Sequence, residues 1–565
     1  MRGTSERHRN QPSQERNGLM SECIDSAQDL LETAQRHLST AVDTLASSTR
    51  SAEGRVDQQA LDAHQVDLVD VAQVACLVGA GQSLARRAAA GTAGPDGDSL
   101  ALGFAGYVAG EVLSKSAGRQ TLWGNGVEFP ASALAAARDA ELLTAIARRL
   151  PTQGYRDLPI GEDLDTARTV FREFGRDRIE PFAEALHRHD QDIPDAVIDE
   201  LAAMGFFGMG IPEEYGGSST GGDSAHSHHD LLAMLVATEE ITRASMGLAG
   251  PFVTRPEILA TALMKGGDAA QAKRWLPDVA AGAKMVAVAV TEPGYGSDAA
   301  NLTVRAVRDG DHYVIKGVKT WSTFSGRAEL LLVMARTGTV QQRHKGLSLF
   351  VVEKPAFTGH TWTWDSPHGG RLEAQAIPTI GYRGMHSFEI SFDDLRVPAD
   401  CLIGGDDALG RGFYLQMNAF ANGRTQTAAR GVGLMKAALG AAFRYSHERA
   451  VFGRILFDYQ LTQWKLGMMA CHAAACQAYA YDVADLLAAG GGQLEASMVK
   501  SVACRSAEWV TREAQQLHGG YGYAEEYPVS RYFLDARVLA LFEGADETLA
   551  LRVIGRGLVE RAPAR

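Results

Sequence analysis

The spacing of apolar residues changes twice along this chain, and this change limits the possible folds more than any other feature. Between about residues 284 and 398, short β-branched or alternating runs such as Val286–Val290 and Phe388–Phe392 are separated by Gly and Asp turns. A period of two is typical of strands that bury one face. Elsewhere apolar residues recur at three and four positions, which predicts helices. We therefore expect a mainly α protein with a central antiparallel β domain built as a small barrel.

Turns rich in Gly and Pro divide the 565 residues into segments. The predicted segments are a disordered tail (1–20), a helical N-terminal extension (21–155), a further α domain (156–283), the β domain (284–405) and a C-terminal α-helical bundle (406–565). The tail lacks the apolar stretch of a secretory signal. Met20 opens a helical pattern and is an alternative start to Met1.

Charge and cysteine content argue against several classes of protein. The net charge of −13 is unfavourable for nucleic-acid binding. We find no apolar run that approaches the roughly 20 residues of a membrane span, so no membrane association is expected. The six cysteines form no CxxC pair, and the three His in Gly222–His229 favour a solvated loop. We predict no metal site and a cytoplasmic location.

Glu543 is the first candidate for chemistry, because it directly follows the apolar run Val538–Phe542. A carboxylate that is partly withdrawn from water is a candidate general base, and an ordinary surface turn is the alternative. Upstream, Gly519 and Gly520 interrupt a helical pattern and allow the backbone to approach a bulky group.

Two further segments carry groups suited to a cofactor. The turn Val290–Asp298 follows a strand, and its Gly and hydroxyl residues could hold a polar or anionic group; a plain Gly-rich turn is the alternative. The strand Gly317–Thr323 contains Trp321, a residue type that is more often part of a core than a cofactor contact.

Taken together, these motifs resemble the acyl-CoA dehydrogenase family of flavoproteins, over roughly Leu158 to the C-terminus. The matching motifs are Thr291-Glu292-Pro293 with Gly296-Ser297-Asp298, Gly317-x-Lys319-x-Trp321-x-Thr323, Arg449-x-x-Phe452-Gly453, Gln516-x-x-Gly519-Gly520 and Phe542-Glu543-Gly544. The resemblance implies an α-helical domain, a β-barrel and a C-terminal four-helix bundle, here preceded by the extension. It also implies FAD as the cofactor.

The resemblance implies that each FAD is held by two chains. Within one chain the expected contacts are Val290 and Thr291 on the flavin ring, Gly296 and Ser297 on the phosphates, Trp321 beside the ring, and Thr323 at flavin N5. The contacts expected from the neighbouring subunit are Arg449, Phe452, Gln460, Gln516, Gly519 and Gly520. A homodimer or homotetramer follows from this division.

The implied reaction is α,β-dehydrogenation of an acyl-CoA thioester. Glu543 would take the α-proton and flavin N5 the β-hydride, with electron-transfer flavoprotein as the acceptor of the electrons. Arg424, Phe542 and Gly544 would shape the substrate site. Gly423 occupies the position at which some members carry the base, which leaves Glu543. Ala545 and Glu547 differ from the family's Thr and Gln, so those FAD contacts are in doubt.

The N-terminal extension narrows the implied substrate. An extension on such a core is similar to the subgroup that oxidises (2S)-methylsuccinyl-CoA to mesaconyl-CoA in the ethylmalonyl-CoA pathway. A dicarboxylic substrate needs a cation, for which Arg255 is the first candidate, with Arg383 and His386 as weaker ones. A charge at a helix start, paired with Glu257, is an equal alternative for Arg255. Other open functions are a different short- or branched-chain dehydrogenase, an oxidase and a non-catalytic flavoprotein.

Overall fold

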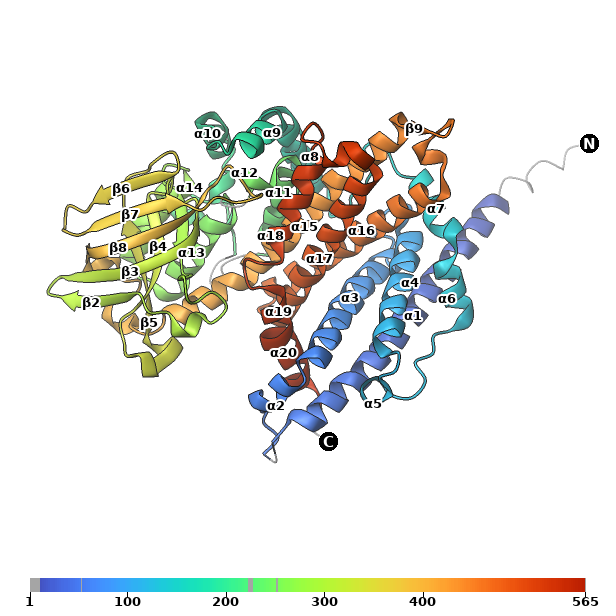
Figure 1. The fold of residues 1–565 in the computed structure, drawn as a ribbon, viewed down its shortest axis with the longest axis horizontal. Helices are drawn as coiled ribbons and strands as arrows, with labels where there is room; N and C mark the ends of the chain where they lie inside the picture. Colours follow the sequence, from blue (N-terminus) through green and yellow to red (C-terminus); the bar gives the residue numbers. More distant parts are fainter. Residues whose placement is uncertain (1–10, 52, 222–226, 250–251, 564–565) are drawn as a thin grey trace, which may run out of the picture.

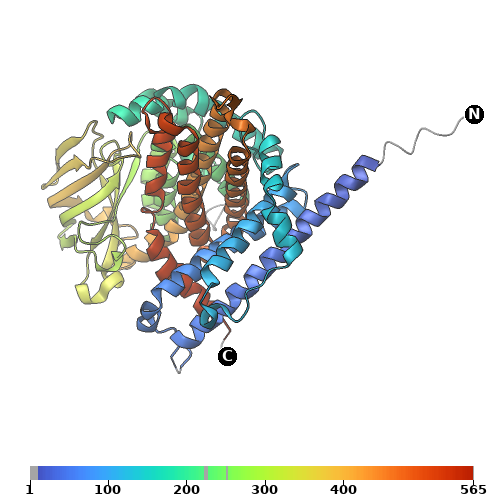
Figure 2. The same ribbon diagram turned by 45° about the vertical axis from the view of Figure 1, so that its right-hand side comes forward.

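The computed structural model describes residues 11–51, 53–221, 227–249 and 252–563. Figure 1 shows three parts arranged in a row: a sheet at one end, a bundle of long helices in the middle, and the helices of the extension on the far side. The same order of parts is visible in Figure 2. Along the chain, helices come first, then the sheet, then helices again, as the periodicity predicts.

Among its described residues, the extension consists of seven helices. They are α1 (Gln11–Thr49), α2 (Gln58–Ala63), α3 (Gln65–Ala89), α4 (Gly97–Ser116), α5 (Gln120–Trp123), α6 (Ala131–Arg138) and α7 (Ala140–Arg148). Residues 1–10 lie outside the described residues, but 11–20 form the first turns of α1. Helix α1 thus begins ahead of Met20, where the sequence pattern opens a helix, and the disorder of the tail stays a prediction.

Helix α3 is long and apolar enough to cross a membrane, contrary to the expectation that no segment is. Within the described residues it is the one helix that meets this criterion, and 67% of its most apolar window is buried. It packs against α1 and α4 of the extension and against α16 (Gln460–Ala488) and α17 (Gln493–Leu517) of the bundle. This environment is that of a core helix.

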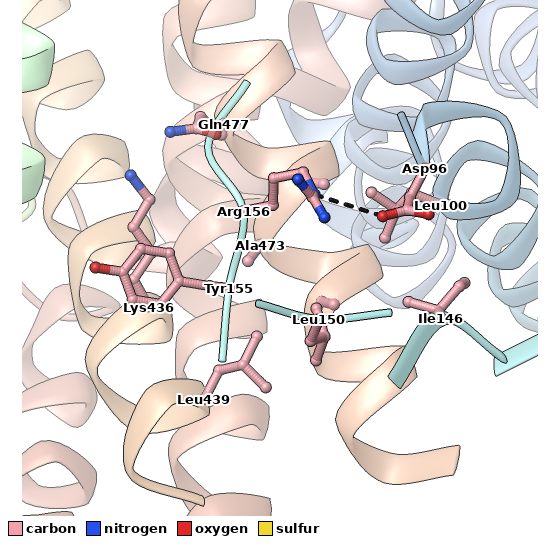
Figure 3. A pocket seen from close by; sticks show the side chains of 12 residues that line it. Asp96, Leu100, Ile146, Leu150, Tyr155, Arg156, Lys436, Leu439, Ala473 and Gln477 are labelled. Atoms are coloured by element: carbon pink, nitrogen blue, oxygen red, sulfur yellow. Dashed lines mark ion pairs between the residues drawn. The ribbon is translucent and has the colours of Figure 1, made fainter. Parts of the chain in front are cut away.

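Small residues allow the extension to dock closely on the bundle. A Cβ atom at Gly79 of α3 would lie 2.9 Å from the Tyr479 ring of α16. A Cβ at Gly467 of α16 would lie 2.1 Å from the Leu143 carbonyl of α7. A cavity of about 20 Å³ lies at this junction. Figure 3 shows Arg156, in the linker formed by residues 149–161, pointing toward Asp96 of the extension.

The α domain that follows the linker consists mainly of α8 (Glu162–Phe174), α9 (Glu180–His189), α10 (Asp195–Ala203), α11 (His228–Ala244), α12 (Met246–Ala249), α13 (Thr254–Gly266) and α14 (Ala269–Ala280). A buried ionic cluster joins it to the linker and the bundle. Lys436 Nζ lies 2.6 Å from Asp157 and 2.7 Å from Glu239, and Glu240 is nearby. Burial alone would lower the pKa of Lys436, but the three carboxylates outweigh it and raise that pKa.

The sheet has eight strands: β1 (Val286–Ala289), β2 (Arg305–Asp309), β3 (His312–Thr323), β4 (Leu330–Arg336), β5 (Leu347–Glu353), β6 (Thr361–Asp365), β7 (Arg371–Ala376) and β8 (Ser387–Pro398). Their order is β1-β4-β2-β3-β8-β7-β6, and β5 pairs with β4. The prediction of an antiparallel sheet needs correction, because β1–β4 and β2–β4 are parallel pairs. A stretch that includes β2 and β3 separates β1 from β4, which allows the chain to return in the same direction.

The C-terminal part is a helical bundle. It contains α15 (Gly412–Glu448), the hairpin β9 (Ala450–Val451) and β10 (Arg454–Ile455), α16, α17, α18 (Val529–Leu539), α19 (Asp546–Thr548) and α20 (Gly555–Arg561). Helix α15 packs on α11, α13, α16, α17 and α18. The loop between α18 and α19, which contains Glu543, therefore lies close to α13 and α15.

Candidate active site

Glu543 lies in a constrained loop rather than in a simple surface turn. Its φ angle is +54°, and that of the next residue, Gly544, is +98°. The left-handed region is unfavourable for a residue with a Cβ, so the surrounding structure must hold this loop. Lys500 does so by donating to the Gly544 carbonyl over 2.6 Å. The Glu543 side chain is only 5% exposed.

Arg255 approaches Glu543 from α13. Its Nη1 atom lies 3.6 Å from Glu543 Oε1, and the Arg255 side chain is 11% exposed. Glu257, the alternative partner, accepts hydrogen bonds from Asn422 (2.7 Å) and Thr261 (3.3 Å). The structure therefore places Arg255 at the carboxylate of the predicted base.

The centre around Glu543 contains polar atoms that the protein itself does not satisfy. Among the described residues, Glu543 Oε2, Arg255 Nε, Arg424 Nε and Tyr382 Oη are buried without a hydrogen-bond partner. Buried polar groups are normally paired, so several unpaired ones in one place indicate a site that a ligand completes. The backbone of α15 also comes close, since a Cβ at Gly423 would lie 3.4 Å from Glu543 Oε2.

Two arginines of α15 belong to this centre, of which Arg430 is buried and Arg424 is partly buried. Arg424 donates to Ser497 over 3.2 Å, and burial lowers its pKa while Glu543 opposes this shift. Arg430 donates to Thr254, and its guanidinium lies 5.6 Å from the centroid of the Phe542 ring. The site is thus strongly cationic around one carboxylate. Nothing in the sequence around Arg430 distinguishes it from a surface helix charge.

Tyr382 is a site residue that the sequence analysis missed. Its ring lies 5.7 Å from that of Phe542, and burial raises the pKa of its hydroxyl. Its backbone N–H donates to Asp535 over 2.6 Å. It precedes Arg383, a weaker candidate for a substrate carboxylate. Arg383 donates to the carbonyls of Thr379 and His187, which ties it to the protein surface around α9.

The predicted flavin-binding segments lie side by side. Val290 and Thr291 follow β1 directly, and the Thr291 carbonyl accepts a hydrogen bond from Thr320 N in β3 at 2.9 Å. Thr323 ends β3, with its hydroxyl 3.0 Å from Ser387 Oγ. Lys319 donates to the Val290 carbonyl over 2.8 Å and so fixes the start of the turn that follows β1.

A β-bulge directs Trp321 outward. The pairing of β3 with β8 shifts between Lys319 and Ser322, and Trp321 has a φ angle of +57°. Bulges re-aim side chains, and here the large indole ring is left 56% exposed. An exposed Trp beside the hydroxyl of Thr323 is a surface for a planar ring to stack on.

The Gly-rich turn and the Glu543 loop are linked. Ser297, predicted to meet the phosphates, is 2.9 Å from the hydroxyl of Thr548, two positions past the start of α19. Cβ atoms at Gly294 or Gly296 would meet no atom closer than 3.9 Å, so the turn has open space beside it. The sequence analysis did not predict a role for Thr548.

The other predicted cofactor residues gather elsewhere. Arg449, Phe452, Gln460, Gln516, Gly519 and Gly520 are all exposed. They lie at one end of the bundle, where α15 and α17 end, α16 begins and the β9 hairpin projects. In Figure 1 this end lies across the bundle from the sheet that carries Trp321. One chain therefore does not bring the two groups of residues together.

Comparison with known proteins identifies the family of this chain. Three family models match: the N-terminal domain of acyl-CoA dehydrogenase at residues 161–283, its middle domain at 287–395 and its C-terminal domain at 410–559. The chain belongs to the acyl-CoA dehydrogenase family. It is an oxidoreductase that acts on CH–CH groups, as the family does.

Relatives within the family differ in activity. The chain is 38% identical to (2S)-methylsuccinyl-CoA dehydrogenase of Cereibacter sphaeroides over 71% of its own length and 70% of that protein. It is 32% identical to acryloyl-CoA reductase (NADH) of Anaerotignum propionicum over 72% and 96%. The structure of butyryl-CoA dehydrogenase from Megasphaera elsdenii superposes with a TM-score of 0.64 and 29% identity, over 71% and 100%.

The cofactor of the acyl-CoA dehydrogenase family is FAD, and the residues of this chain fit it. The turn at Gly294 and Gly296 leaves open space, as close approach of a phosphate requires. Trp321 offers an exposed ring face, and the Thr323 hydroxyl lies beside it. When bound, FAD accepts the hydride in the family's oxidation of acyl thioesters.

Proposed function

We propose that this enzyme oxidises a dicarboxylic short branched acyl-CoA, (2S)-methylsuccinyl-CoA, to mesaconyl-CoA. The observation that carries this proposal is the position of Arg255, whose Nη1 lies 3.6 Å from Glu543 Oε1 in a buried site. A guanidinium suits a carboxylate, and a buried one beside the base can hold the free carboxylate of such a substrate.

Glu543 is the proposed base. Its unpaired Oε2 atom can accept the α-proton of the thioester, which leaves a C=C bond once the β-hydride has also departed. Arg424 and Arg430 supply positive charge in the same buried region, where charges act more strongly than in water. Phe542 and Gly544 border the base on either side.

The length of the relatives supports the same substrate. The match to the Cereibacter dehydrogenase leaves about three tenths of both chains outside it, whereas the Anaerotignum reductase is matched over 96% of its length. The Cereibacter protein thus has room for an extension of the size found here. This likeness favours the methylsuccinyl-CoA activity over that of a reductase without such a segment.

Anaerobic bleaching of the bound flavin tests the proposal. We expect methylsuccinyl-CoA to bleach the flavin absorbance rapidly, and butyryl-, isobutyryl-, isovaleryl- and glutaryl-CoA to do so slowly. Rapid bleaching by a monocarboxylic thioester alone would contradict the dicarboxylate proposal and keep the dehydrogenase. Absence of bleaching with all five thioesters would contradict both the dicarboxylate proposal and the dehydrogenase activity on short acyl-CoA substrates.

Arg255→Ala tests the role of the arginine. We expect the Michaelis constant for methylsuccinyl-CoA to rise at least about tenfold, as for loss of a charge-assisted hydrogen bond, and that for butyryl-CoA to change little. Lys265→Ala, at the other end of α13, is the control, since no contact of its side chain with the site is present among the described residues. Equal effects of Arg255→Ala on both substrates would contradict the proposal.

The partners proposed for the enzyme follow the family. We infer that electron-transfer flavoprotein reoxidises the FAD and that the enzyme is a cytoplasmic homodimer or homotetramer. Figure 1 shows the β9 hairpin across the bundle from strand β3, and this separation supports the oligomer, since a second copy would bring the two groups of predicted cofactor residues together. A peroxide assay during turnover distinguishes this acceptor from oxygen.

A further inference from the structure

A cluster of metal-ligating side chains lies where the α domain meets the sheet. It consists of Asp190, just past the end of α9, His360, just before β6, and His386, just before β8. Within the described part of the chain, this is the one group of three such residues whose ligand atoms lie within 4.8 Å of one another. Asp190 and His386 have positive φ angles of 50° and 43°. The backbone therefore adopts unfavourable conformations to hold both side chains.

The distances are those of neighbouring ligands on one metal ion. His360 Nε2 lies 3.0 Å from Asp190 Oδ2, and His386 Nε2 lies 3.4 Å from Asp190 Oδ1. Around a tetrahedral ion with bonds of about 2.0–2.2 Å, adjacent ligand atoms are about 3.3–3.6 Å apart. The separation of His386 Nε2 from Asp190 lies within this range, and that of His360 Nε2 is slightly shorter.

Asp192 orients His386 for this purpose. Its Oδ1 atom lies 3.0 Å from His386 Nδ1, and its Oδ2 accepts the N–H of Gly359 over 2.8 Å. The other ring nitrogen of His386, Nε2, lies 3.4 Å from Asp190 Oδ1 and 3.1 Å from the Asp190 carbonyl. A carboxylate behind a ligating imidazole is the usual support of a metal-bound histidine.

Arg383 pairs only weakly with this cluster. Its Nε stays 4.0 Å from Asp190 Oδ1, and it donates to the carbonyls of Thr379 and His187 instead. The oxygen atoms of Asp190 therefore face the two histidines rather than an arginine.

We propose that Asp190, His360 and His386 bind a divalent first-row transition metal ion, with Asp192 as a positioning residue. Two imidazoles and one carboxylate are a ligand set that suits zinc and its neighbours. His360 is 53% exposed, so the site opens to solvent, and water can complete the coordination. The ion would join the end of α9 to two segments of the sheet.

Zinc titration of the FAD-containing full-length enzyme tests this site. After treatment with a chelator and dialysis, we expect calorimetry to show one Zn²⁺ bound per chain, and Co²⁺ to give visible d–d absorption bands. Zinc should also raise the thermal midpoint. His360→Ala should abolish all three effects without harming the fold, because its side chain is half exposed. Asp192→Asn should weaken binding about 10–100-fold.

His64→Ala is the matched control, because His64 is also a surface histidine, 3.5 Å from a carboxylate, in the extension. It should bind zinc as the unchanged enzyme does. Equal zinc binding by the unchanged enzyme and by His360→Ala would overturn the proposal. No stoichiometric binding at all would overturn it as well.

Discussion

At the scale of single residues, the proposed base Glu543 is distinguished by its local backbone conformation. Glu543 and Gly544 both have positive φ angles, and Glu543 carries a Cβ that makes this unfavourable. The loop persists because Lys500 binds the Gly544 carbonyl and Ser501 and Arg505 bind Asp546. These contacts hold the strained loop in a conformation that directs the Glu543 carboxylate toward Arg255.

Glu543→Gln is expected to remove catalysis and leave the cofactor in place. The amide has nearly the same shape but cannot take a proton, so the rate of flavin bleaching by substrate should fall about 10²–10⁴-fold. Stopped-flow absorbance under nitrogen measures this rate, and the unreduced flavin spectrum serves as the control for FAD content. Bleaching at the full rate would assign the base to another residue.

Asp535 should make stability depend on pH. Burial raises its pKa from 3.8 to about 6, although Arg531 and the Tyr382 N–H oppose the shift. A raised folded-state pKa means that its stabilising contribution is fully present below about pH 3.8 and is lost as the pH rises through 6. Two pKa units correspond to about 3 kcal/mol of unfolding free energy.

Denaturant unfolding between pH 4 and 7 measures this contribution. Asp535→Asn should flatten the part of the pH dependence that Asp535 causes. Asp199→Asn, an exposed carboxylate of α10, is the control and should leave the profile unchanged. Identical profiles for the unchanged enzyme and Asp535→Asn would contradict the assignment.

At the scale of elements, β3 shows how a local irregularity shapes the proposed cofactor site. The strand pairs regularly with β8 until the shift between Lys319 and Ser322, where Trp321 turns outward and Thr323 returns to the sheet. A regular strand would place residues 321 and 323 on the same face. Because of the bulge, the Trp321 ring is exposed, whereas the Thr323 hydroxyl lies within hydrogen-bonding distance of Ser387.

The contact between α7 and α16 should depend on Gly467. An added Cβ would lie 2.1 Å from the Leu143 carbonyl, so Gly467→Ala must push the helices apart. We expect a loss of about 1–3 kcal/mol in unfolding free energy, despite the better helix propensity of alanine. Gly491→Ala is the control, since its Cβ would have ordinary contacts at 3.6 Å.

Thermal unfolding and limited proteolysis measure the result. Cleavage between residues 149 and 161 should become faster in Gly467→Ala, because this linker joins the extension to the α domain. Unchanged unfolding and cleavage would mean that the interface adjusts without cost. Gly491→Ala should behave as the unchanged enzyme in both experiments.

At the scale of the whole molecule, exposed apolar side chains at the end of the bundle that carries the β9 hairpin indicate a protein interface. Phe452 is 97% exposed at the tip of the β9 hairpin, Tyr523 is 89% exposed, and Leu461 is 65% exposed. Large apolar side chains grouped on a surface often mark an interface. They border the residues predicted to reach the FAD of a neighbouring subunit.

Phe452→Asp is expected to weaken both assembly and cofactor binding. Loss of an aromatic anchor commonly costs about 1–2 kcal/mol or more, which is about a tenfold weaker association. Light scattering after size exclusion measures the oligomer, and the ratio of flavin to protein absorbance measures FAD content. Val66→Asp, 75% exposed in the extension, is the control. A full FAD content in a monomeric Phe452→Asp protein would contradict the shared site.

The sequence alone determined much of this protein. The change of period between residues 284 and 398 predicted the helix–sheet–helix order, because side-chain periodicity follows directly from backbone geometry. The motifs at Thr291, Trp321 and Glu543 pointed to the family. Short segments with unusual backbone conformations accept few residue types, so their sequences are recognisable by themselves. The parallel pairs of β4 and the helical start at Gln11 were not predicted, because pairing and helix ends depend on contacts made elsewhere.

Tertiary structure decided which distant residues meet. Tyr382, Arg430 and Thr548 join the site from segments without a local signal, and Arg255 faces Glu543 across 288 positions of sequence. The sequence likewise predicted no metal site, since Asp190, His360 and His386 are separated by 170 and 26 positions. Such contacts depend on how helices and sheet pack together, which periodicity and motif spacing do not encode.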